Sequence, residues 1–430
     1  MKTSTRSDLG PEGYISFCRP RIPELLRQIS PQYLIGNIPP ERWSESGERP
    51  THILSVGKAA RQMSESLTHL FSIPVSQTLT ILPEGYPPPE NLPFVTGNHP
   101  YPGTGSQNAA RQALSFVQAI PPDGSLLCGI SGGASSLLFL PAPGLDPGIK
   151  SELLFRLMSK GAPIDILNLV RIHLSSIKGG GLLREFRGRG VRTVLLSDTP
   201  CLPPELVGSG PTFFQPRDGE KAISILQEWL SPEEIPGIVQ QTLRSPQNDP
   251  AIHAPEFPSI LLGNSETVLQ KAAALLAPEG IQPELLTACL SGDAQEAGKV
   301  LGSIIRWKAH HQKKTSLFLA TGETTVTLRE ESGQGGRTLE LGLSLGLSLR
   351  DTPAVIGSLA TDGLDGNSGL SGILLDTTSI QGESVMTRIR KSLRMHNTGP
   401  LAQAEGFSLQ YGPSGTNLND LIWVYLPHPN

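Results

Sequence analysis

The sequence is poor in charged residues, which make up only 17% of its 430 positions, against roughly 25% in an average soluble domain. The 35 basic and 39 acidic residues leave a formal net charge of -4. No block of Lys and Arg is long enough to follow a phosphate backbone. A nucleic-acid partner is therefore not expected.

Long hydrophobic runs are also missing. No stretch of about 18 apolar residues, the length needed to span a membrane as a helix, occurs in the chain. The first residues, MKTSTRSDLG, lack the continuous apolar stretch of a secretory signal. We therefore expect a cytoplasmic protein with no membrane partner.

Cysteine is scarce, with four residues that are far apart in the chain: Cys18, Cys128, Cys201 and Cys289. Their spacing matches neither a CxxC metal or redox motif nor a dense disulfide framework, so we interpret all four as buried thiols. No HExxH motif is present, and a histidine-bound structural metal is not expected.

Glycine and proline are abundant, with 46 and 39 residues, or about a fifth of the chain against roughly 12% on average. The total stays below the level of low-complexity sequences, and the glycines have no three-residue period. These features predict a folded protein with many tight turns. The length predicts two or three domains.

From about residue 50 onwards, short apolar runs alternate with turns and longer amphipathic stretches, a pattern typical of an α/β fold. Strands are predicted over 52–56, 78–82, 125–130, 192–197, 259–262, 284–287, 316–320, 324–329 and 354–359. Helices are predicted over 59–70, 106–119, 149–159, 219–230, 266–277 and 293–310. In the last helix, one apolar face is expected to be buried: Ala294, Ala297, Val300, Leu301, Ile304 and Ile305.

A domain boundary is predicted in the stretch 245–258, which carries four prolines and no periodicity. The two domains are then 1–245 and 246–430. Each is long enough to bury its own core.

The turn after the first predicted strand is suited to an anion. Gly57 and Lys58 precede a predicted helix, whose free N–H groups would attract negative charge together with the lysine. The motif is not a Walker A loop, because Ala59 replaces Ser or Thr. A solvated surface lysine is the alternative.

A glycine-rich loop follows the strand over 125–130. Adjacent glycines can turn successive N–H groups toward one concavity, and hydroxyls add further donors. A plain tight turn between strand and helix is the alternative. The residues concerned are Ser131, Gly132, Gly133 and Ser135.

A basic segment precedes a run of three glycines. Arg171 and Lys178 are seven residues apart, so they would form one basic edge if the segment were helical. His173 and Ser175 lie between them. A surface helix with a glycine C-cap is the alternative.

Carboxylates at the ends of strands are further candidates. Asp198 follows the strand over 192–197, where it could hold Mg²⁺ or accept a hydroxyl proton. It could equally cap a turn, because Asp before Thr-Pro is common turn chemistry. In the C-terminal part, Glu323 and Arg337 flank a predicted strand and a glycine loop, and Asp362 follows another strand.

Near the C-terminus, the segment 411–420 is rich in small and amide residues. It is either a turn or a loop that hydrogen-bonds a substrate. The candidates for substrate contact are Thr416, Asn417 and Asn419.

These motifs occur in a fixed order: VGKAA, GNHPYPGTGS, SGGASSLL, VRIHLSSIKGGGLL, LSDTP with GSGPT, TGETTVTL, GQGGRTLELGL, TDGLDG and GPSGTNLNDL. The set closely resembles the type 2 glycerate kinase family, over about residues 10 to 426. The C-terminal region of that family is named for its MOFRL motif, which would cover about residues 315–426.

The resemblance implies ATP- and Mg²⁺-dependent phosphorylation of D-glycerate, typically on the 2-hydroxyl. It also implies a larger Rossmann-like αβα domain, a smaller α/β domain and an active site in the cleft between them. The reactive lysine of the family corresponds to Lys58, its glycine-loop arginine to Arg337, and its acidic positions to Asp198 and Glu323.

The chemistry of phosphoryl transfer agrees with this set, because it needs cations that hold phosphate oxygens and a metal bridge. Lys58 and Arg337 can supply the charge, and Asp198 and Glu323 are the candidate Mg²⁺ ligands. The expected ligands are glycerate and ATP, and a homodimer is a candidate assembly. The wider set expected to contact substrate or phosphate is Ser131, Gly132, Gly133, Ser135, Arg171, His173, Ser175, Lys178, Glu323, Asp362, Thr416, Asn417 and Asn419.

The chain departs from the family pattern at Ile172, where a lysine is expected, and at Thr338-Leu339, where Asn-Gln is expected. Two other functions stay open. Hydroxypyruvate reductase activity would need a nicotinamide site, but no GxGxxG motif with a downstream acidic residue is present. A non-catalytic sugar-acid or nucleotide-binding protein is the second alternative.

Overall fold

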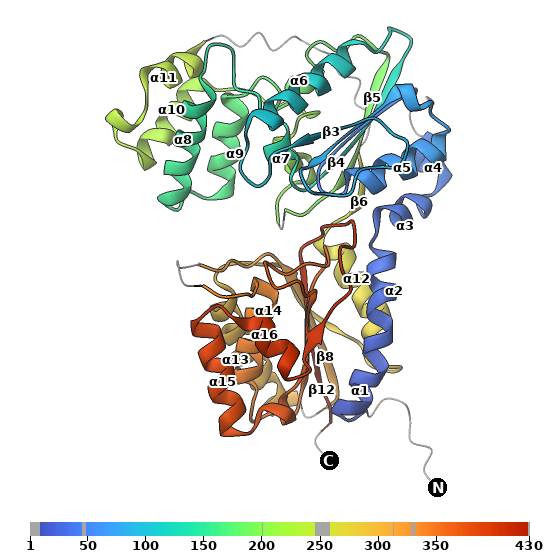
Figure 1. The fold of residues 1–430 in the computed structure, drawn as a ribbon, viewed down its shortest axis with the longest axis vertical. Helices are drawn as coiled ribbons and strands as arrows, with labels where there is room; N and C mark the ends of the chain where they lie inside the picture. The colour runs from blue at the N-terminus through green and yellow to red at the C-terminus, as the bar shows by residue number, and fades with distance from the viewer. Residues whose placement is uncertain are drawn as a thin grey trace. The chain divides into compact units, whose positions relative to one another are not determined.

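The computed structural model describes residues 9–44, 49–199, 201–245, 259–312, 314–327 and 332–428. The chain forms two compact units, each built around a six-stranded sheet (Figure 1). The parallel-sheet unit comprises Ile35–Ser197 and Leu202–Leu262. The mixed-sheet unit comprises Met1–Leu34, Asp198–Cys201 and Gly263–Asn430. The predicted two-domain α/β organisation is confirmed, although neither unit is continuous in sequence.

The sheet of the first unit has the strand order β3-β2-β1-β4-β5-β6, which is the order of a Rossmann fold. The pairs β1–β2, β1–β4, β2–β3 and β4–β5 are parallel. Every residue of β2 and β4 is buried, as expected for a sheet covered on both faces. The strands are β1 (His52–Val56), β2 (Thr78–Pro83), β3 (Phe94–Gly97), β4 (Ser125–Ser131), β5 (Gly190–Leu196) and β6 (Ile260–Gly263).

Helices cover both faces of this sheet. Met63 of α5 packs beside Ser55 and Gly129 on one face, whereas α6 and α7 share a core with Leu54 and Val56 on the other. These helices are α5 (Ala60–Phe71), α6 (Thr104–Gln118) and α7 (Ala134–Leu137). The result is the expected αβα arrangement.

A helical cluster with its own core completes the parallel-sheet unit (Figure 1). It contains α8 (Pro147–Ser159), α9 (Ile164–His173), α10 (Gly219–Trp229) and α11 (Gly237–Arg244). Asp146 caps the first of these helices, because its carboxylate accepts hydrogen bonds from the backbone N–H groups of Gly148 and Ile149. The helix over 149–159 is therefore confirmed, and it begins two residues earlier than predicted.

The second sheet has the order β11-β10-β9-β12-β8-β7 and is mostly antiparallel, with β7 and β8 parallel. Its last strand in sequence, β12, lies between β9 and β8 and is fully buried. The strands are β7 (Glu284–Leu290), β8 (Ser316–Gly322), β9 (Val355–Ala360), β10 (Gly372–Asp376), β11 (Ser408–Leu409) and β12 (Asp420–Leu426).

Alternate residues of β12 face two different helical layers. Ile422 and Val424 share a core with α13 and α14, whereas Tyr425 stacks on Tyr14 of α1 with ring centroids 3.9 Å apart. Figure 1 shows α13 to α16 on one side of this sheet and α12 with α1 on the other. The helices are α1 (Pro11–Cys18), α2 (Ile22–Gln28), α12 (Ser265–Leu276), α13 (Ala294–Gln312), α14 (Arg337–Ser348), α15 (Glu383–Arg394) and α16 (Thr398–Ala404).

The N-terminal helices therefore belong with the second sheet. The hydroxyl of Tyr14 donates to the carbonyl of Leu276 at the end of α12, and the hydroxyl of Tyr425 donates to the carbonyl of Leu9. The short helices α3 (Pro31–Gly36) and α4 (Pro40–Ser44) follow on the way to β1. The predicted division into domains 1–245 and 246–430 placed these N-terminal helices with the first sheet instead. Residues 246–258 of the predicted boundary lie outside the described residues.

Eight of the predicted strands and all six predicted helices are present. The strand predicted over 324–329 is wrong for the part that the structure describes, where only an isolated bridge joins Thr325 to Asp293. In α13, Val300 and Ile304 are 58% and 41% exposed rather than buried, because the buried face is the narrower stripe that contacts α14. No helix among the described residues is long and apolar enough to cross a membrane.

Candidate functional site

The end of β1 and the end of β4 lie side by side, because these strands are parallel neighbours. The N–H of Lys58 donates to the carbonyl of Gly132 over 2.8 Å, and the N–H of Ala59 donates to the hydroxyl of Ser131. Gly57 has φ +127°, and a Cβ there would lie 2.2 Å from the Ser131 hydroxyl oxygen. Glycine at this position is required for the two loops to meet, which brings Lys58 beside the glycine-rich loop.

His99 is a third member of this group. Gly133 has φ +86°, and a Cβ at this position would meet the His99 ring at 3.2 Å and the Lys58 side chain at 3.3 Å. Burial and the nearby Lys58 charge lower the pKa of His99 to about 4, so its imidazole is neutral at physiological pH. His99 lies in the GNHPYPGTGS motif but was not a candidate from the sequence, because the strand before it, β3, was not predicted.

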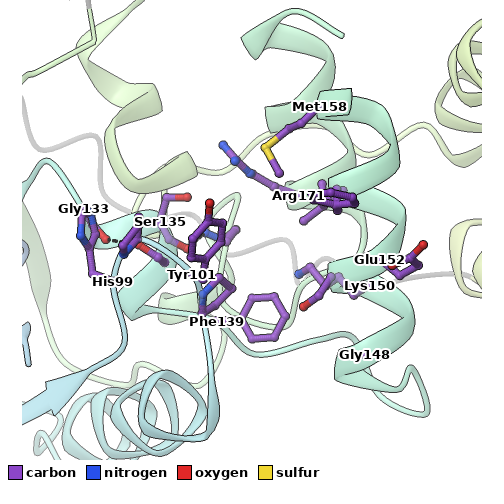
Figure 2. A pocket seen from close by; sticks show the side chains of 17 residues that line it. His99, Tyr101, Gly133, Ser135, Phe139, Gly148, Lys150, Glu152, Met158 and Arg171 are labelled. Atoms are coloured by element: carbon purple, nitrogen blue, oxygen red, sulfur yellow. Dashed lines mark hydrogen bonds between the residues drawn. The ribbon is translucent and has the colours of Figure 1, made fainter. Parts of the chain in front are cut away.

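A pocket of about 650 Å³ adjoins this group within the parallel-sheet unit. Figure 2 shows His99, Gly133 and Ser135 on one side and residues of α8 on the other, with Phe139 between them. The pocket is lined by His99, Pro100, Tyr101, Pro102, Gly133, Ser135, Ser136, Phe139, Gly148, Lys150, Ser151, Glu152, Leu154, Phe155, Met158, Arg171 and Lys178.

Three cations line this pocket, and two of them are fully buried. Lys150 has no exposed surface and Lys178 has 1%; their ammonium groups donate to the carbonyls of Leu174 and Ser135 over 2.8 and 2.5 Å. Arg171 is half-buried and contacts the Asn168 carboxamide. In the part of the chain that the structure describes, none of the three has a carboxylate within ion-pair distance.

The basic groups of the pocket are close enough to lower one another's pKa values. Burial, followed by the charges of Arg171 and Arg217, lowers the pKa of Lys150 to about 7. Burial, followed by the charges of Lys150 and Arg171, lowers the pKa of Lys178 well below its usual range. Charged groups are rarely buried without a partner, so this arrangement is suited to an anionic ligand. Lys150 was missed because it lies on an amphipathic helix with no motif around it.

Arg171 and Lys178 line the same pocket, but not as one helical edge. Helix α9 ends at His173, and the Ser175 hydroxyl then accepts hydrogen bonds from the N–H groups of Ile177 and Lys178. This turn, rather than two helical turns, brings Lys178 back toward the pocket.

His173 and Ser175 act on the backbone in this structure. The Nδ1 atom of His173 contacts the carbonyl of Leu169, and its Nε2 accepts from the N–H of Asp218. The Ser175 hydroxyl donates to the carbonyl of Leu140. Both side chains hold the loop that carries Lys178.

The mixed-sheet unit carries a second charged group, centred on Arg337 at the first residue of α14. Its Nε donates to Asp420 over 2.7 Å and its Nη1 to Glu323 over 2.6 Å. Burial alone lowers the pKa of Arg337, but the Asp420 and Glu323 charges outweigh it and raise the pKa. Burial raises the pKa of Asp420 to about 7, against the opposing effect of Arg337.

Other acidic residues nearby act on the backbone. Asp365 accepts hydrogen bonds from the N–H groups of Thr338 and Leu339 and so caps α14. Asp362 accepts from the N–H of Leu364 in the turn after β9. Asp420 and Asp365 were not selected from the sequence, because neither stands in a pattern that distinguishes it from turn residues.

In the same unit, Asp198 contacts the segment 411–420 near the C-terminus. The carboxamide of Asn417 donates to its Oδ2 over 3.1 Å. The Thr416 hydroxyl and the Asn419 carboxamide oxygen are buried and have no hydrogen-bond partner in the described chain. Asn419 also donates to the Ser265 hydroxyl at the start of α12. Asp198, Thr416 and Asn417 therefore lie close in space, as a substrate-binding loop would require.

The prediction that all four cysteines are free thiols is wrong for two of them. Cys201 and Cys289 form a disulfide with Cα atoms 5.7 Å apart, although they are 88 residues apart in sequence. The fold brings the segment after β5 against β7, which no spacing rule could indicate. Cys18 and Cys128 are buried and free, as predicted.

The departures from the family pattern lie in the core. Ile172, Thr338 and Leu339 are at most 3% exposed, and a Cβ at Gly179 would touch the Ile172 side chain. Ile172 is not among the residues that line the pocket.

The described residues contain no group of three His, Cys, Asp or Glu that could hold a metal ion. Mg²⁺ in nucleotide sites usually needs only one or two carboxylates besides substrate phosphates. Asp198 is a candidate for such a place: it follows β5, and its carboxylate accepts a hydrogen bond from the Asn417 carboxamide. Glu323 fits less well, because it already pairs with Arg337.

The fold and the two charged groups define a two-unit α/β protein with loops suited to anions at its strand ends. A family profile described as a domain of unknown function, DUF4147, matches residues 22–244, just over half of the chain, and the MOFRL profile matches 316–420. The chain belongs to this family, the type 2 glycerate kinases with a C-terminal MOFRL region, as predicted.

Three similar proteins illustrate the relationship. Glycerate 2-kinase of Pyrococcus horikoshii is 28% identical over 391 residues, covering 86% of each chain. A protein of Agrobacterium vitis with a provisional hydroxypyruvate reductase name is 30% identical over 383 residues, covering 86% of this chain and 85% of its own. The crystal structure of a glycerate kinase from Thermotoga maritima has a TM-score of 0.81 and 25% identity, covering 97% of this chain and 100% of its own.

Proposed function

We propose that the protein transfers the γ-phosphoryl group of ATP to the 2-hydroxyl of D-glycerate. The observation that carries the proposal is the positive group at the ends of β1 and β4, where Lys58 adjoins a pocket with three cations. Phosphoryl transfer depends on positioning and charge stabilisation more than on covalent chemistry. A relative named glycerate 2-kinase shares 28% of its residues with this chain, which supports the same substrate.

The proposed roles follow from the charges. Lys58 stabilises negative charge on the transferred phosphoryl group. Arg337, fixed by Asp420 and Glu323, offers the remaining face of its guanidinium to an anionic group of the substrate. Asp198 would hold Mg²⁺, which on arrival with ATP neutralises phosphate charge.

The test is a coupled ADP-release assay with D-glycerate, ATP and Mg²⁺, with phosphorus NMR to identify the product. We expect ADP release that requires both glycerate and Mg²⁺, with 2-phosphoglycerate as product. A 3-phosphoglycerate signal would contradict the position of transfer but leave the kinase class intact. NADH oxidation with hydroxypyruvate would favour the reductase, and no turnover would favour a binding protein.

Lys58→Ala should lower kcat/KM at least about a hundredfold, the usual effect of removing one donor that stabilises transition-state charge. Its thermal unfolding midpoint should change little, because Lys58 is only half-buried at a loop. Lys221→Ala, on the exposed first turn of α10, is the matched control. Equal activity of the two variants would remove Lys58 from the site.

A further inference from the structure

The pocket beside Lys58 has two chemically different parts. Its inner part holds the buried ammonium groups of Lys150 and Lys178 with the guanidinium of Arg171. Its outer part carries three large side chains that are unusually exposed: Tyr101, Phe155 and Met158, at 77%, 59% and 42%. In Figure 2, Tyr101 lies near the His99 side of the pocket and Met158 on α8 across from it.

Each part needs a different kind of partner. Buried cations without carboxylates are stabilised by an anion that carries several charges. Exposed aromatic rings and a methionine are suited to a flat, apolar or aromatic group. A ligand that satisfies both parts has a polyanionic end joined to an aromatic end.

The volume of the pocket indicates which of the two substrates of the proposed reaction, ATP or glycerate, it is suited to bind. Its volume of about 650 Å³ falls within the range of about 300–1,000 Å³ that encloses ligands of drug size. Glycerate has three carbons and no aromatic group, so it would leave most of this space and all three exposed side chains without contact. A nucleotide has the required size, charge and ring.

A second pocket with a basic lining lies among α13, α14 and α15. It differs from the pocket beside Lys58 in the burial of its cations. All five cations that line it are exposed, and two of them, Lys299 and Arg390, also pair with Glu296 and Glu383; the other three are Arg306, Arg350 and Arg394. Charges that stay solvated need no ligand to compensate them. The buried and unpaired cations are found in the pocket beside Lys58.

We infer that this pocket is the nucleotide site of the protein, with the phosphates on Lys150, Arg171 and Lys178 and the base against Tyr101, Phe155 and Met158. The inference rests on the proposed function for the identity of the nucleotide as ATP. It adds the place where the nucleotide binds and names Lys150 and the three rim residues as its contacts. The phosphate end then extends toward Lys58 across Gly133 and His99, which are neighbours of the Lys58 side chain.

Binding to the full chain tests this, without turnover, by calorimetric titration with ADP, adenosine and inorganic tripolyphosphate. Lys150→Met should weaken ADP and tripolyphosphate at least tenfold. Tyr101→Ala combined with Phe155→Ala should weaken ADP and adenosine tenfold and leave tripolyphosphate within twofold. The controls are Lys221→Met and Phe94→Ala, an exposed cation and an exposed aromatic residue outside the pocket.

Because the rim side chains are exposed, the double rim variant should fold even if Lys150→Met does not, and its thermal unfolding midpoint verifies this. Unchanged ADP affinity in the folded rim variant would overturn the inference, as would a loss confined to D-glycerate or 2-phosphoglycerate. If glycerate is phosphorylated while the KM for ATP is unaffected by these changes, the inference fails and the proposed function stands. If ADP binding depends on the pocket but glycerate is not phosphorylated, the proposed function fails and the nucleotide site stands.

Discussion

At the scale of single residues, the fully buried Lys150 is the most costly feature of the parallel-sheet unit. Its ammonium group has one carbonyl acceptor, on Leu174, and lies 5.1 Å from the centre of the Phe139 ring. These contacts replace only part of the water that a charged lysine loses on burial. A buried lysine without full compensation lowers the free energy of unfolding, and such a cost is typical of residues in a functional site.

Replacing Lys150 by Met should therefore stabilise the ligand-free protein at pH 7. The pKa of Lys150 is about 7 in the folded protein, lowered by burial and by Arg171 and Arg217, against about 10.4 for an exposed lysine. Between about pH 7 and pH 10.4 the unfolded chain binds more protons than the folded protein. The free energy of unfolding of the wild type therefore rises with pH over this range, and this gain is lost as the pH falls to about 7.

The stability advantage of Lys150→Met should accordingly be largest near pH 6, amount to a few kcal/mol, and shrink toward pH 10. Urea unfolding of both proteins at several pH values measures it, with Lys221→Met as the exposed control. An advantage that does not shrink between pH 6 and pH 10 would show that Lys150 stays charged in the folded state.

At the scale of elements, the segment after β5 is held by side chains of the mixed-sheet unit. Asp198 is bonded to Asn417 and Cys201 is joined to Cys289 on β7. The strand β7 is at the edge of its sheet, and Glu323 donates its N–H to the Leu290 carbonyl at the end of that strand. The disulfide therefore connects the backbone that carries Asp198 with the backbone next to Glu323.

Removing the disulfide, in a variant with Cys201→Ser and Cys289→Ser, should lower the free energy of unfolding. For a closed loop of 88 residues, the chain-entropy model gives roughly 4–5 kcal/mol. Urea unfolding with and without a thiol reductant measures this, and the double variant should be insensitive to the reductant. Alkylation of Cys201 and Cys289 in protein that is denatured without a reductant would contradict the bond itself.

At the scale of the whole molecule, the mixed-sheet unit is built from both ends of the chain, since the N-terminal helices α1 and α2 pack with the C-terminal half. Tyr14 has no exposed surface, stacks on Tyr425 with an interplanar angle of 3°, and donates to the Leu276 carbonyl. Burial raises the pKa of its hydroxyl well above the usual range, so the group stays a donor. One side chain of α1 thus joins the last strand to the end of α12.

Tyr14→Ala should destabilise the protein by about 3–5 kcal/mol, the range for truncating a buried aromatic side chain. Tyr14→Phe keeps the ring and loses one hydrogen bond, at a cost of about 1 kcal/mol. Urea unfolding followed by far-UV circular dichroism measures both, with the exposed Phe94→Ala as control. Equal stability of Tyr14→Ala and wild type would contradict the assignment of residues 11–28 to this unit.

Local patterns were sufficient for most of the parallel-sheet unit. Runs such as 52–56 and 125–130 are strands because they are apolar, short and bounded by turn residues. The meeting of Lys58 with Gly132 and Gly133 follows from one further rule, that loops after parallel strands gather at one edge of the sheet. The resemblance to the family was carried by the same loops, and the family profiles confirm it.

The sequence by itself determined the strands β1, β2, β4 and β5, the helices α5, α6, α8 and α10, and the loops at the ends of those strands, because these depend on local pattern and turn chemistry. Only the tertiary structure decided that β12 lies at the centre of its sheet, that Cys201 meets Cys289, and that Lys150 is buried beside Arg171 and Lys178. Each of these depends on segments far apart in the chain coming together. The burial of a lysine is a property of everything packed around it, and no window of the sequence contains those neighbours.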